Sequence, residues 1–285
     1  MQTGKIGVQM MMLKNEVEEY GFYEVMRRLT EIGYHAVEVS QIPMTSENIK
    51  EMQRASKDFD MDIAAMSCGL ADLSPETKYP GDTLENNFDK IVADCHAVDC
   101  TILRVGMLPL TKATTIEDML EVVDELEEYA SRLKEHGIDL YYHPHNFEFV
   151  LWNKKPVLTH MKERTSQLGF ELDSHWIWRG GFDPAQYIQS FKGRIRALHL
   201  KDYRIGLIED EEIFTRIGYD FFGRIEQFAE VGEGTLDIPE IVEAGFSSGC
   251  DYFFVEQDDT YGRDVYDCLQ NSYGNLIQMG YEELF

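Results

Sequence analysis

The stretch that decides the fold is TILRVGMLPLTKATTIEDMLEVVDELEEYASRLKEHGIDLYYHPH, residues 101–145. Residues 101–105 are an expected strand, and residues 116–136 have the periodicity of a long amphipathic helix. Gly137 is the expected stop of that helix, and the apolar run 139–145 is the next expected strand. A strand, a helix and a strand in this order indicate a crossover unit with parallel strands.

The same alternation continues on both sides of this unit. Further apolar runs predict strands over 5–10, 35–39, 63–66, 168–173, 196–200 and 252–256. Helical periodicity or composition predicts helices over 17–32, 46–59, 86–97, 156–163, 184–191, 238–244 and 265–279. Eight such units fit a closed (β/α)8 barrel better than an open sheet.

No Gly/Ser-rich linker or low-complexity tract divides the chain, so residues 1–285 are expected to form one domain. The main irregularity is the connection 203–234 after the seventh expected strand. Connections of this length in compact domains are usually functional, and we expect this one to be a lid or a partner contact.

Charge and composition exclude several classes of protein. The chain has 26 Lys and Arg against 52 Asp and Glu, a net charge of −26, which argues against nucleic-acid partners and anionic membrane surfaces. No apolar run reaches the ~18 residues of a membrane span, and the start of the chain does not resemble a signal peptide. The five cysteines are odd in number and form no CxxC pair, so we expect reduced thiols in a cytoplasmic protein.

Ionisable side chains gather where the expected strands end, and in such barrels the chemistry lies at the carboxyl-terminal ends of the strands. The fifth strand leads into His143-Pro144-His145-Asn146-Phe147-Glu148. His143 and His145 are two apart and share a face, and Glu148 follows on the loop. Two imidazoles beside a carboxylate indicate a functional site, while a buried pair bonded to neighbouring carbonyls is the structural alternative.

The sixth strand ends in Glu171-Leu172-Asp173-Ser174-His175-Trp176, where Asp173 and His175 share a face. The structural alternative for Asp173 is the N-cap of a following helix. The residues after it do not have the pattern of a helix start, so we favour a role in a site.

The seventh strand ends in His199-Leu200-Lys201-Asp202, and the eighth leads into Glu256 after Phe253-Phe254-Val255. A solvated Lys201–Asp202 pair is one structural interpretation, and a salt bridge between Glu256 and Lys201 inside the barrel is another. An acid directly after an apolar strand is otherwise hard to explain as part of a solvated face.

The last four strands thus each deliver a metal-binding side chain to one rim. The candidate ligands are Glu148, Asp173, His199 and Glu256. Three carboxylates and one imidazole suit Mn²⁺ first, with Mg²⁺, Co²⁺ or Zn²⁺ as alternatives, and leave positions open for substrate oxygens.

On these motifs, together with Val231-Gly232-Glu233-Gly234-Thr235-Leu236-Asp237, the chain resembles the xylose-isomerase-like TIM barrels over nearly all its length. This is the sugar phosphate isomerase/epimerase superfamily. The resemblance implies one divalent metal held by Glu148, Asp173, His199 and Glu256. Many epimerases of the superfamily have a catalytic glutamate on the fifth strand where this chain has His143. That departure implies a histidine base, with the metal ligand shifted to Glu148.

More narrowly, the chain is similar to the catalytic α subunits of bacterial C-glycoside deglycosidases, which cleave 3-oxo-glycosides and pair with a small β-sandwich β subunit. The histidine-rich fifth strand, the run Asp202-Tyr203-Arg204 and the long loop after it carry this similarity. It implies a sugar or glycoside substrate and an accessory subunit, and relatives in the superfamily imply an oligomer.

The chemistry that fits these residues is proton abstraction beside a sugar carbonyl, with a metal stabilising the enolate. We expect His145 to be the base, with His143 as the second choice or as a residue that orients the ligands. Lys201 is expected to hold a substrate oxygen, and His175 and Trp176 to line the sugar pocket. Expelling a group one carbon further along gives cleavage of a 3-oxo-C-glycoside, whereas reprotonation gives an isomerase or epimerase.

Two other classes stay open at this point. Some barrels of the superfamily are metal-dependent nucleases, which the net charge of −26 disfavours. A non-catalytic scaffold subunit would need a vestigial site, although all four metal-type positions are filled.

Overall fold

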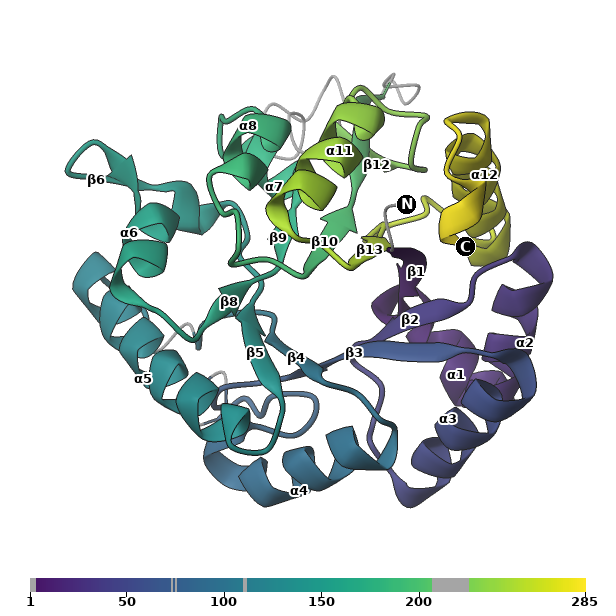
Figure 1. Ribbon diagram of the computed structural model, residues 1–285, viewed down its shortest axis with the longest axis horizontal. Coiled ribbons are helices and arrows are strands. Elements are labelled where there is room, and N and C mark those ends of the chain that lie inside the picture. Colours follow the sequence, from purple (N-terminus) through teal and green to yellow (C-terminus); the bar gives the residue numbers. More distant parts are fainter. Residues whose placement is uncertain (1–3, 73, 75, 110–111, 207–225) are drawn as a thin grey trace.

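The computed structural model describes residues 4–72, 74, 76–109, 112–206 and 226–285. Its centre is one nine-stranded sheet with the strand order β8-β5-β4-β3-β2-β1-β13-β10-β9, in which all neighbouring pairs are parallel. The strands close into a barrel and the helices form a ring around it (Figure 1). The predicted (β/α)8 barrel is therefore confirmed.

All eight expected strands are present. They are β1 (Lys5–Gln9), β2 (Ala36–Val39), β3 (Asp62–Cys68), β4 (Ile102–Val105), β5 (Asp139–Tyr142), the pair β8 (Gly169–Phe170) and β9 (Leu172–Asp173), β10 (Ala197–Leu200) and β13 (Tyr252–Val255). The sixth strand is divided at Glu171 because its first half pairs with β5 and its second half with β10. That change of partner closes the barrel.

The expected helices are present in the same order. The outer ring contains α1 (Lys14–Tyr20), α2 (Phe22–Ile32), α3 (Ser46–Phe59), α4 (Leu84–Ala97), α5 (Ile116–Lys134), α6 (Val157–Arg164), α8 (Pro184–Gln189), α11 (Ile238–Ser248) and α12 (Val265–Gln278). Side-chain caps start many of them, and in α5 Thr115 and Asp118 form a capping box. Their apolar faces pack on the outside of the barrel and form the main hydrophobic core.

Two helical predictions are corrected by the structure. The helix expected over 17–32 is broken into α1 and α2 at Gly21, whose positive φ of 84° is a conformation that favours glycine. A short helix that the sequence analysis did not expect, α7 (Ser174–Arg179), begins directly after Asp173.

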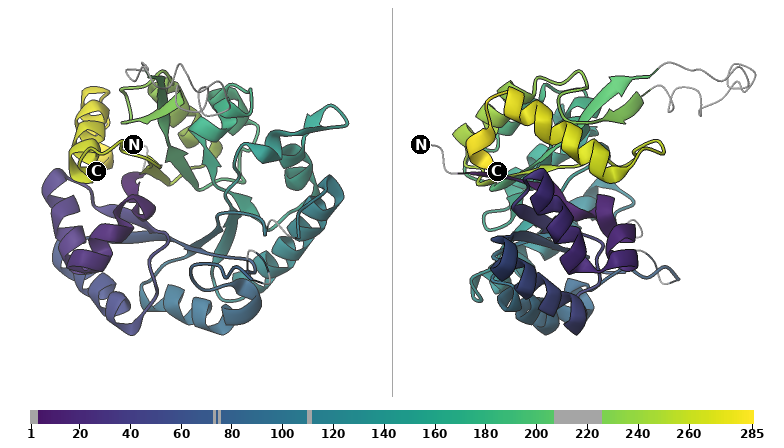
Figure 2. Two further views of the ribbon diagram at one scale, coloured as in Figure 1. Left: turned by 180° about the vertical axis from the view of Figure 1, so that it is seen from behind. Right: turned by 90° about the vertical axis from the view of Figure 1, so that its right-hand side faces the viewer.

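The long connection after the seventh strand contains an antiparallel pair, β11 (Asp202–Ile205) and β12 (Glu226–Ala229). These strands extend beyond the barrel at the end opposite the N-terminus (Figure 2). Residues 207–225 of the predicted 203–234 loop lie outside the described residues. In the described part of the chain, no helix has the length and apolar character needed to cross a membrane.

Period-two alternation places two kinds of side chain inside the barrel. The layer near the amino-terminal ends is apolar and includes Ala36, Ile102, Tyr141, Ala197 and Phe254. Two residues further along the same strands, the inward positions are ionisable: Glu38, Arg104, His143, His199 and Glu256, all buried. Inside the barrel, a layer of ionisable side chains therefore lies next to an apolar layer, on the side of the carboxyl-terminal ends of the strands.

Candidate metal centre

Four buried side chains converge near the carboxyl-terminal ends of the strands. Each of them offers one ligand atom, all within 4.8 Å of one another: His143, Asp173, His199 and Glu256. His199 Nδ1 lies 2.7 Å from Glu256 Oε2 and 3.8 Å from Asp173 Oδ2. Three of the four ligands predicted from the sequence are therefore brought together, and His143 stands with them in place of Glu148.

Three ligand atoms of this group lack hydrogen bonds although they are buried. Asp173 Oδ2, His199 Nδ1 and Glu256 Oε2 have no hydrogen bond of acceptable geometry. Buried polar atoms are normally satisfied, and three unsatisfied ligand atoms facing one point need an explanation. A divalent cation bound between them supplies it, so the residues present fit a metal ion.

In three of the four residues, the side-chain atom that does not face the group has a hydrogen-bond partner. Asp173 Oδ1 accepts the backbone N–H of Trp176 at 2.9 Å, and Glu256 Oε1 accepts from Gln9 Nε2 at 2.9 Å. His143 Nδ1 lies 3.1 Å from the carbonyl oxygen of Glu171, which leaves Nε2 as its ligand atom. Metal ligands are typically oriented by such outer contacts.

The expectation that Asp173 does not cap a helix is wrong. This residue is the N-cap of α7, and it caps with Oδ1 while Oδ2 faces the ligand group. The residues Ser174 to Arg179 form that helix in spite of their aromatic content. The cap leaves Oδ2 available, so capping and a role in a site are compatible.

Glu148 lies apart from the ligand group. After His143 the chain turns into a short 3-10 helix, η2 (Phe147–Phe149), which contains Glu148. Its carboxylate accepts from the hydroxyl of Tyr142 and, at 2.9 Å, from the backbone N–H of His145. Burial raises the pKa of Glu148 to about 7. In this arrangement the carboxylate supports the turn that carries His145.

His145 lies beside the ligand group with a free ring nitrogen. Its ring centroid is 4.9 Å from that of His143, and it stacks on Phe147 at 5.7 Å. Its Nδ1 atom is buried without a partner. Burial, with the charge of Lys201 as a further cause, lowers the pKa of His145 to about 4, so the ring is neutral at neutral pH and can accept a proton.

Lys201 extends into the same space from β10. Its Nζ atom lies 2.6 Å from Asp258, 3.4 Å from Glu256 and 3.9 Å from Asp173. Burial alone would lower the pKa of Lys201, but these carboxylates raise it, and the ammonium stays charged. The interior salt bridge between Lys201 and Glu256 is thus present.

The solvated Lys201–Asp202 pair, considered from the sequence, is absent from the described residues. Asp202 is buried, and its carboxylate accepts the backbone N–H groups of Tyr203, Gly232, Gly234 and Leu236. These contacts tie the start of β11 to the segment that follows β12. Asp202 therefore organises the base of the hairpin.

The two predicted pocket residues differ in position. Trp176 is partly buried between the ring of His145, at 5.3 Å, and the ammonium of Lys201, at 4.8 Å from the indole centroid. His175 is only 1% exposed and packs against Trp178, Tyr203 and Phe228, so it lies behind the pocket wall. Trp176 is the better placed of the two to contact a sugar.

Three buried residues next to the site were not predicted from the sequence. Glu38, Arg104 and Glu171 come from β2, β4 and the β8–β9 junction, and Arg104 Nε lies 2.6 Å from Glu38 Oε1 and 3.4 Å from Glu171 Oε2. The signal for them was present, since a charged residue inside an apolar strand such as Ile102–Val105 is unusual. Glu38 and Arg104 lie within their strands and not beyond the strand ends, where the predicted residues lie.

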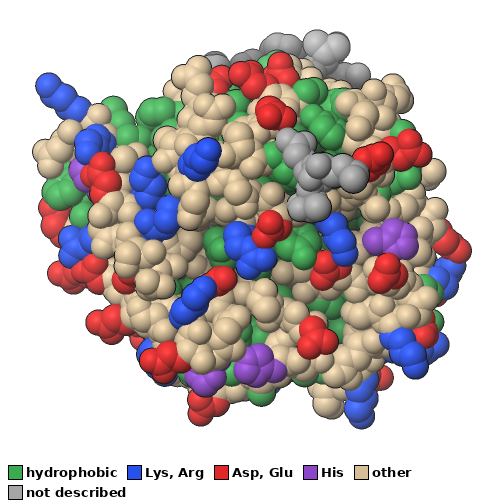
Figure 3. Space-filling model, viewed as in Figure 1, with side chains coloured by type: hydrophobic (Ala, Val, Ile, Leu, Met, Phe, Trp, Pro, Cys, Tyr) green, Lys and Arg blue, Asp and Glu red, His purple; other side chains and the backbone are tan. Residues whose placement is uncertain are grey.

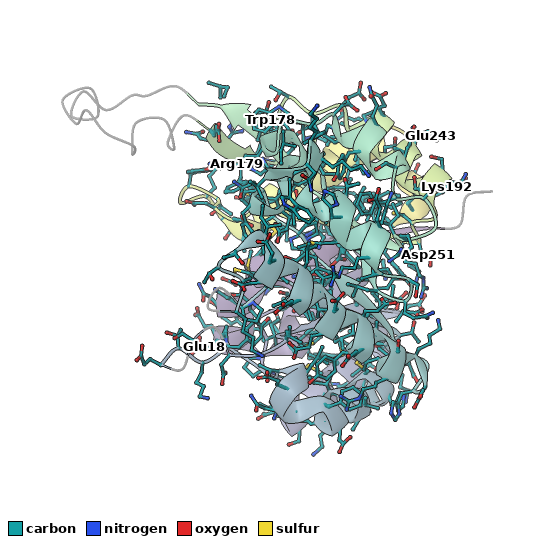
Figure 4. The ribbon with its side chains drawn as sticks, turned by 90° about the vertical axis from the view of Figure 1, so that its left-hand side faces the viewer. Glu18, Trp178, Arg179, Lys192, Glu243 and Asp251 are labelled. Atoms are coloured by element: carbon teal, nitrogen blue, oxygen red, sulfur yellow. The ribbon has the colours of Figure 1, made fainter. Side chains whose placement is uncertain are left out.

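The mouth of the barrel lies at the end where β11 and β12 extend. Figure 4 places Trp178 and Arg179 toward this end, and Lys192 and Asp251 toward the opposite one. A cavity of about 660 Å³ opens here, and among the residues that line it are Met11, Gln257 and Asp258, the partner of Lys201. The four residues of the ligand group do not line this cavity; Asp258 connects it to them through Lys201.

Comparison with known proteins agrees with the fold. A family model described as xylose isomerase-like TIM barrel matches residues 26–263. No curated protein sequence matches the chain. A sugar phosphate isomerase/epimerase from Parabacteroides distasonis is 20% identical, with a TM-score of 0.73 over 96% of this chain and 98% of that one.

Two further solved structures have a similar fold. A probable 3-DHS dehydratase from Bacillus anthracis is 15% identical, with a TM-score of 0.67 over 96% of this chain and 98% of that one. A 3-keto-D-glucoside 4-epimerase from E. coli is 16% identical, with a TM-score of 0.64 over 97% of this chain and 99% of that one. At these identities the likeness shows the fold alone.

Proposed function

Because the chain belongs to the xylose isomerase-like TIM-barrel family, we propose that it is a divalent-metal-dependent enzyme that removes a proton beside a sugar carbonyl. The observation that carries the proposal is the convergence of three buried ligand atoms without hydrogen bonds, those of Asp173, His199 and Glu256, next to His143. Lys201 balances part of the negative charge of this group, and the neighbouring His145 is a neutral base.

We propose His143, Asp173, His199 and Glu256 as the residues that hold the metal. Two imidazoles and two carboxylates suit Mn²⁺, Co²⁺ or Zn²⁺ better than Mg²⁺, which prefers oxygen ligands, and Mn²⁺ is our first choice. When bound, the metal would act as a Lewis acid that polarises the substrate carbonyl. Glu148, which the sequence favoured as a ligand, is assigned instead to support of the His145 turn.

The neighbouring side chains supply the remaining functions. His145 takes the proton, because its ring is neutral and lies beside the ligand group. Lys201 holds a substrate oxygen and stabilises negative charge on it. The face of Trp176 between these two residues packs on the sugar ring.

Ion pairs of three arginines at the mouth favour an uncharged sugar over a sugar phosphate. Among the described residues there, Arg179 pairs with Glu226, and Arg204 and Arg263 both pair with the buried Glu230. These arginines are already engaged with carboxylates, whereas a phosphate group needs free donors. A keto-sugar or a 3-oxo-glycoside fits this environment.

The more specific proposal is cleavage of 3-oxo-C-glycosides. His145 removes the proton at carbon 2, beside the carbonyl at carbon 3, and the electron pair forms a carbon 1–carbon 2 double bond. The group at carbon 1 then leaves with its bonding electrons and receives a proton. The names of two structural relatives, a 3-keto-D-glucoside 4-epimerase and a dehydratase, fit reactions that share the first step.

We also propose that the chain pairs with a small β-sandwich subunit and forms an oligomer, as the resemblance implies. Co-purification of the chain with a small subunit, observed by native mass spectrometry, would support cleavage over isomerisation.

The proposed function is tested by hydrogen exchange. The chelator-treated protein is reloaded with Mn²⁺ and incubated with a 3-oxo-glucoside in deuterium oxide, and the sugar is followed by mass spectrometry. We expect deuterium to enter faster than in an enzyme-free control, and only with metal present. Loss of the group at carbon 1 indicates cleavage, while a recovered or epimeric sugar indicates an isomerase or epimerase. Exchange no faster than the control would contradict the proposal.

A further inference from the structure

We infer that Glu38 is a positioning residue for the metal centre and acts through His199. This inference rests on the ligand set of the proposed function. Glu38 contacts no substrate position in the site described above. Its carboxylate faces the side of His199 that points away from the other ligands.

The contact between the two residues is direct and buried. Glu38 Oε2 lies 3.4 Å from His199 Nε2, and both side chains are fully buried. In the sheet, β2 and β10 are separated by β1 and β13, so this contact crosses the barrel interior. A glutamate on the second strand thus reaches a ligand on the seventh.

The second carboxylate oxygen of Glu38 contacts a buried arginine. Its Oε1 atom lies 2.6 Å from Arg104 Nε, and Arg104 Nη2 donates to Ser40 Oγ at 2.9 Å. This contact is an ion pair without hydrogen-bond geometry, and its charge attraction favours a position of the carboxylate between Arg104 and His199. The pair Glu38–Arg104 therefore lies beneath the ligand.

The chemical consequence concerns the tautomer of His199. An acceptor at Nε2 favours the form that carries hydrogen on Nε2 and a lone pair on Nδ1. Nδ1 is the atom that faces Glu256 Oε2 at 2.7 Å and Asp173 Oδ2 at 3.8 Å. Glu38 thus turns the metal-binding atom of His199 toward the other ligands.

A second metal site is the competing interpretation, because Glu38, Glu171 and His199 also place ligand atoms within 4.8 Å of one another. The guanidinium of Arg104 contacts both carboxylates, at 2.6 and 3.4 Å. This group therefore already contains its cation. Orientation of His199 explains the arrangement without another ion.

The test is titration of chelator-treated protein with MnCl₂ by calorimetry. For Glu38→Gln we expect one site whose Kd is raised about 10- to 100-fold, the usual effect of losing an outer partner of a metal ligand. The matched control is Glu171→Gln, which removes a carboxylate from the same buried cluster. Glu171 lies 3.6 Å from His199 Nε2, beyond hydrogen-bond distance, so a smaller change is expected.

A spectroscopic readout separates positioning from a general loss of stability. In the Zn²⁺-loaded protein, the Nε2–H proton of His199 should resonate downfield and exchange slowly with water. In Glu38→Gln this signal should move upfield. If that variant does not fold, Glu38→Asp retains the charge beside Arg104 but is one methylene shorter, and the same changes are expected.

The possible failures can be told apart. A wild-type protein that binds no Mn²⁺ contradicts the proposed metal centre, and the inference with it. An unchanged Kd in Glu38→Gln, a larger effect in Glu171→Gln, or wild-type His199 without an Nε2–H proton in the Zn²⁺ form overturns the role of Glu38 alone.

Discussion

The two ends of the barrel use the same residue types in opposite ways. At the amino-terminal ends of the strands, Lys5 pairs with Asp62 at 3.0 Å and Arg196 with Asp251 at 2.6 Å, and the side chains of Lys5 and Asp62 are 48% and 30% exposed. Figure 3 views the molecule from this end, and acidic and basic side chains are interspersed on it. Exposed and paired charges of this kind contribute to solubility and little to stability.

At the carboxyl-terminal ends, the charges are buried and several are unsatisfied. The side chains of His199 and Glu256 are 0% and 4% exposed, and their facing atoms lack hydrogen-bond partners. Burial of a charged or polar atom without a hydrogen-bond partner costs free energy, unless a bound ligand supplies the missing contact. Burial, and the lack of hydrogen bonds on several charged atoms, distinguish the functional end from the solvated end.

The largest effect is expected from substitution of a proposed metal ligand at the carboxyl-terminal end of the barrel. Glu256→Gln removes a charged ligand, so the Kd for Mn²⁺ should rise by more than the ~100-fold that marks the upper range for outer residues. Calorimetry measures this change, and activity should be lost with the metal. The matched variant is Asp251→Asn, at the start of the same strand, which should bind Mn²⁺ like the wild type. Equal effects of the two substitutions would abolish the distinction between the ends.

The next effect separates the base from the ligands. His145→Ala should slow deuterium exchange about 10²- to 10⁴-fold, the usual contribution of a general base, while the metal content stays at one per chain. His96→Ala, on the outer helix α4, is the control and should exchange normally. Near-normal exchange in His145→Ala would show that the base is another residue.

A third prediction uses the pH dependence of stability. The folded protein holds the pKa of Glu148 at about 7, above its ordinary value of 4.5, because the carboxyl is buried. As pH rises between these values, the unfolded chain releases the proton first, so the wild type loses stability while Glu148→Gln does not. From pH 5 to 8 the variant should gain on the order of 2–3 kcal/mol relative to wild type.

Urea unfolding of the metal-free proteins at several pH values measures this gain. The same variant also tests the ligand assignment, since its Kd for Mn²⁺ should stay close to that of wild type. A large loss of affinity in Glu148→Gln would restore Glu148 as a ligand. A stability difference that does not change with pH would contradict the raised pKa.

The smallest effect is expected at the solvated end. Lys5→Ala removes an exposed ion pair with Asp62, and exposed pairs contribute about 0–1 kcal/mol. The free energy of unfolding should therefore fall by no more than about 1 kcal/mol, and the Kd for Mn²⁺ should not change. Urea unfolding and calorimetry check both values, and a change in metal affinity would show that the two ends are coupled.

Much of the fold and part of the site were accessible from the sequence. The order of strands and helices was predicted because apolar periodicity is a local property of the chain. Asp173, His199 and Glu256 were predicted because each lies at or just beyond the end of an apolar strand, and the structure brings these three together. The role of Asp173 as a helix cap was missed because the aromatic residues of α7 do not have the usual pattern of a helix start.

The eight strand–helix units and the chemical character of the strand ends are local properties of the amino-acid sequence. The position of His143 within the ligand group, and of Glu148 outside it, depends on the folded chain, because the chain turns into η2 and engages Glu148 with Tyr142. The approach of Glu38 to His199 was likewise decided by barrel closure. Periodicity specifies which face of a strand a residue occupies, whereas distances across the barrel depend on how all the strands close around one axis.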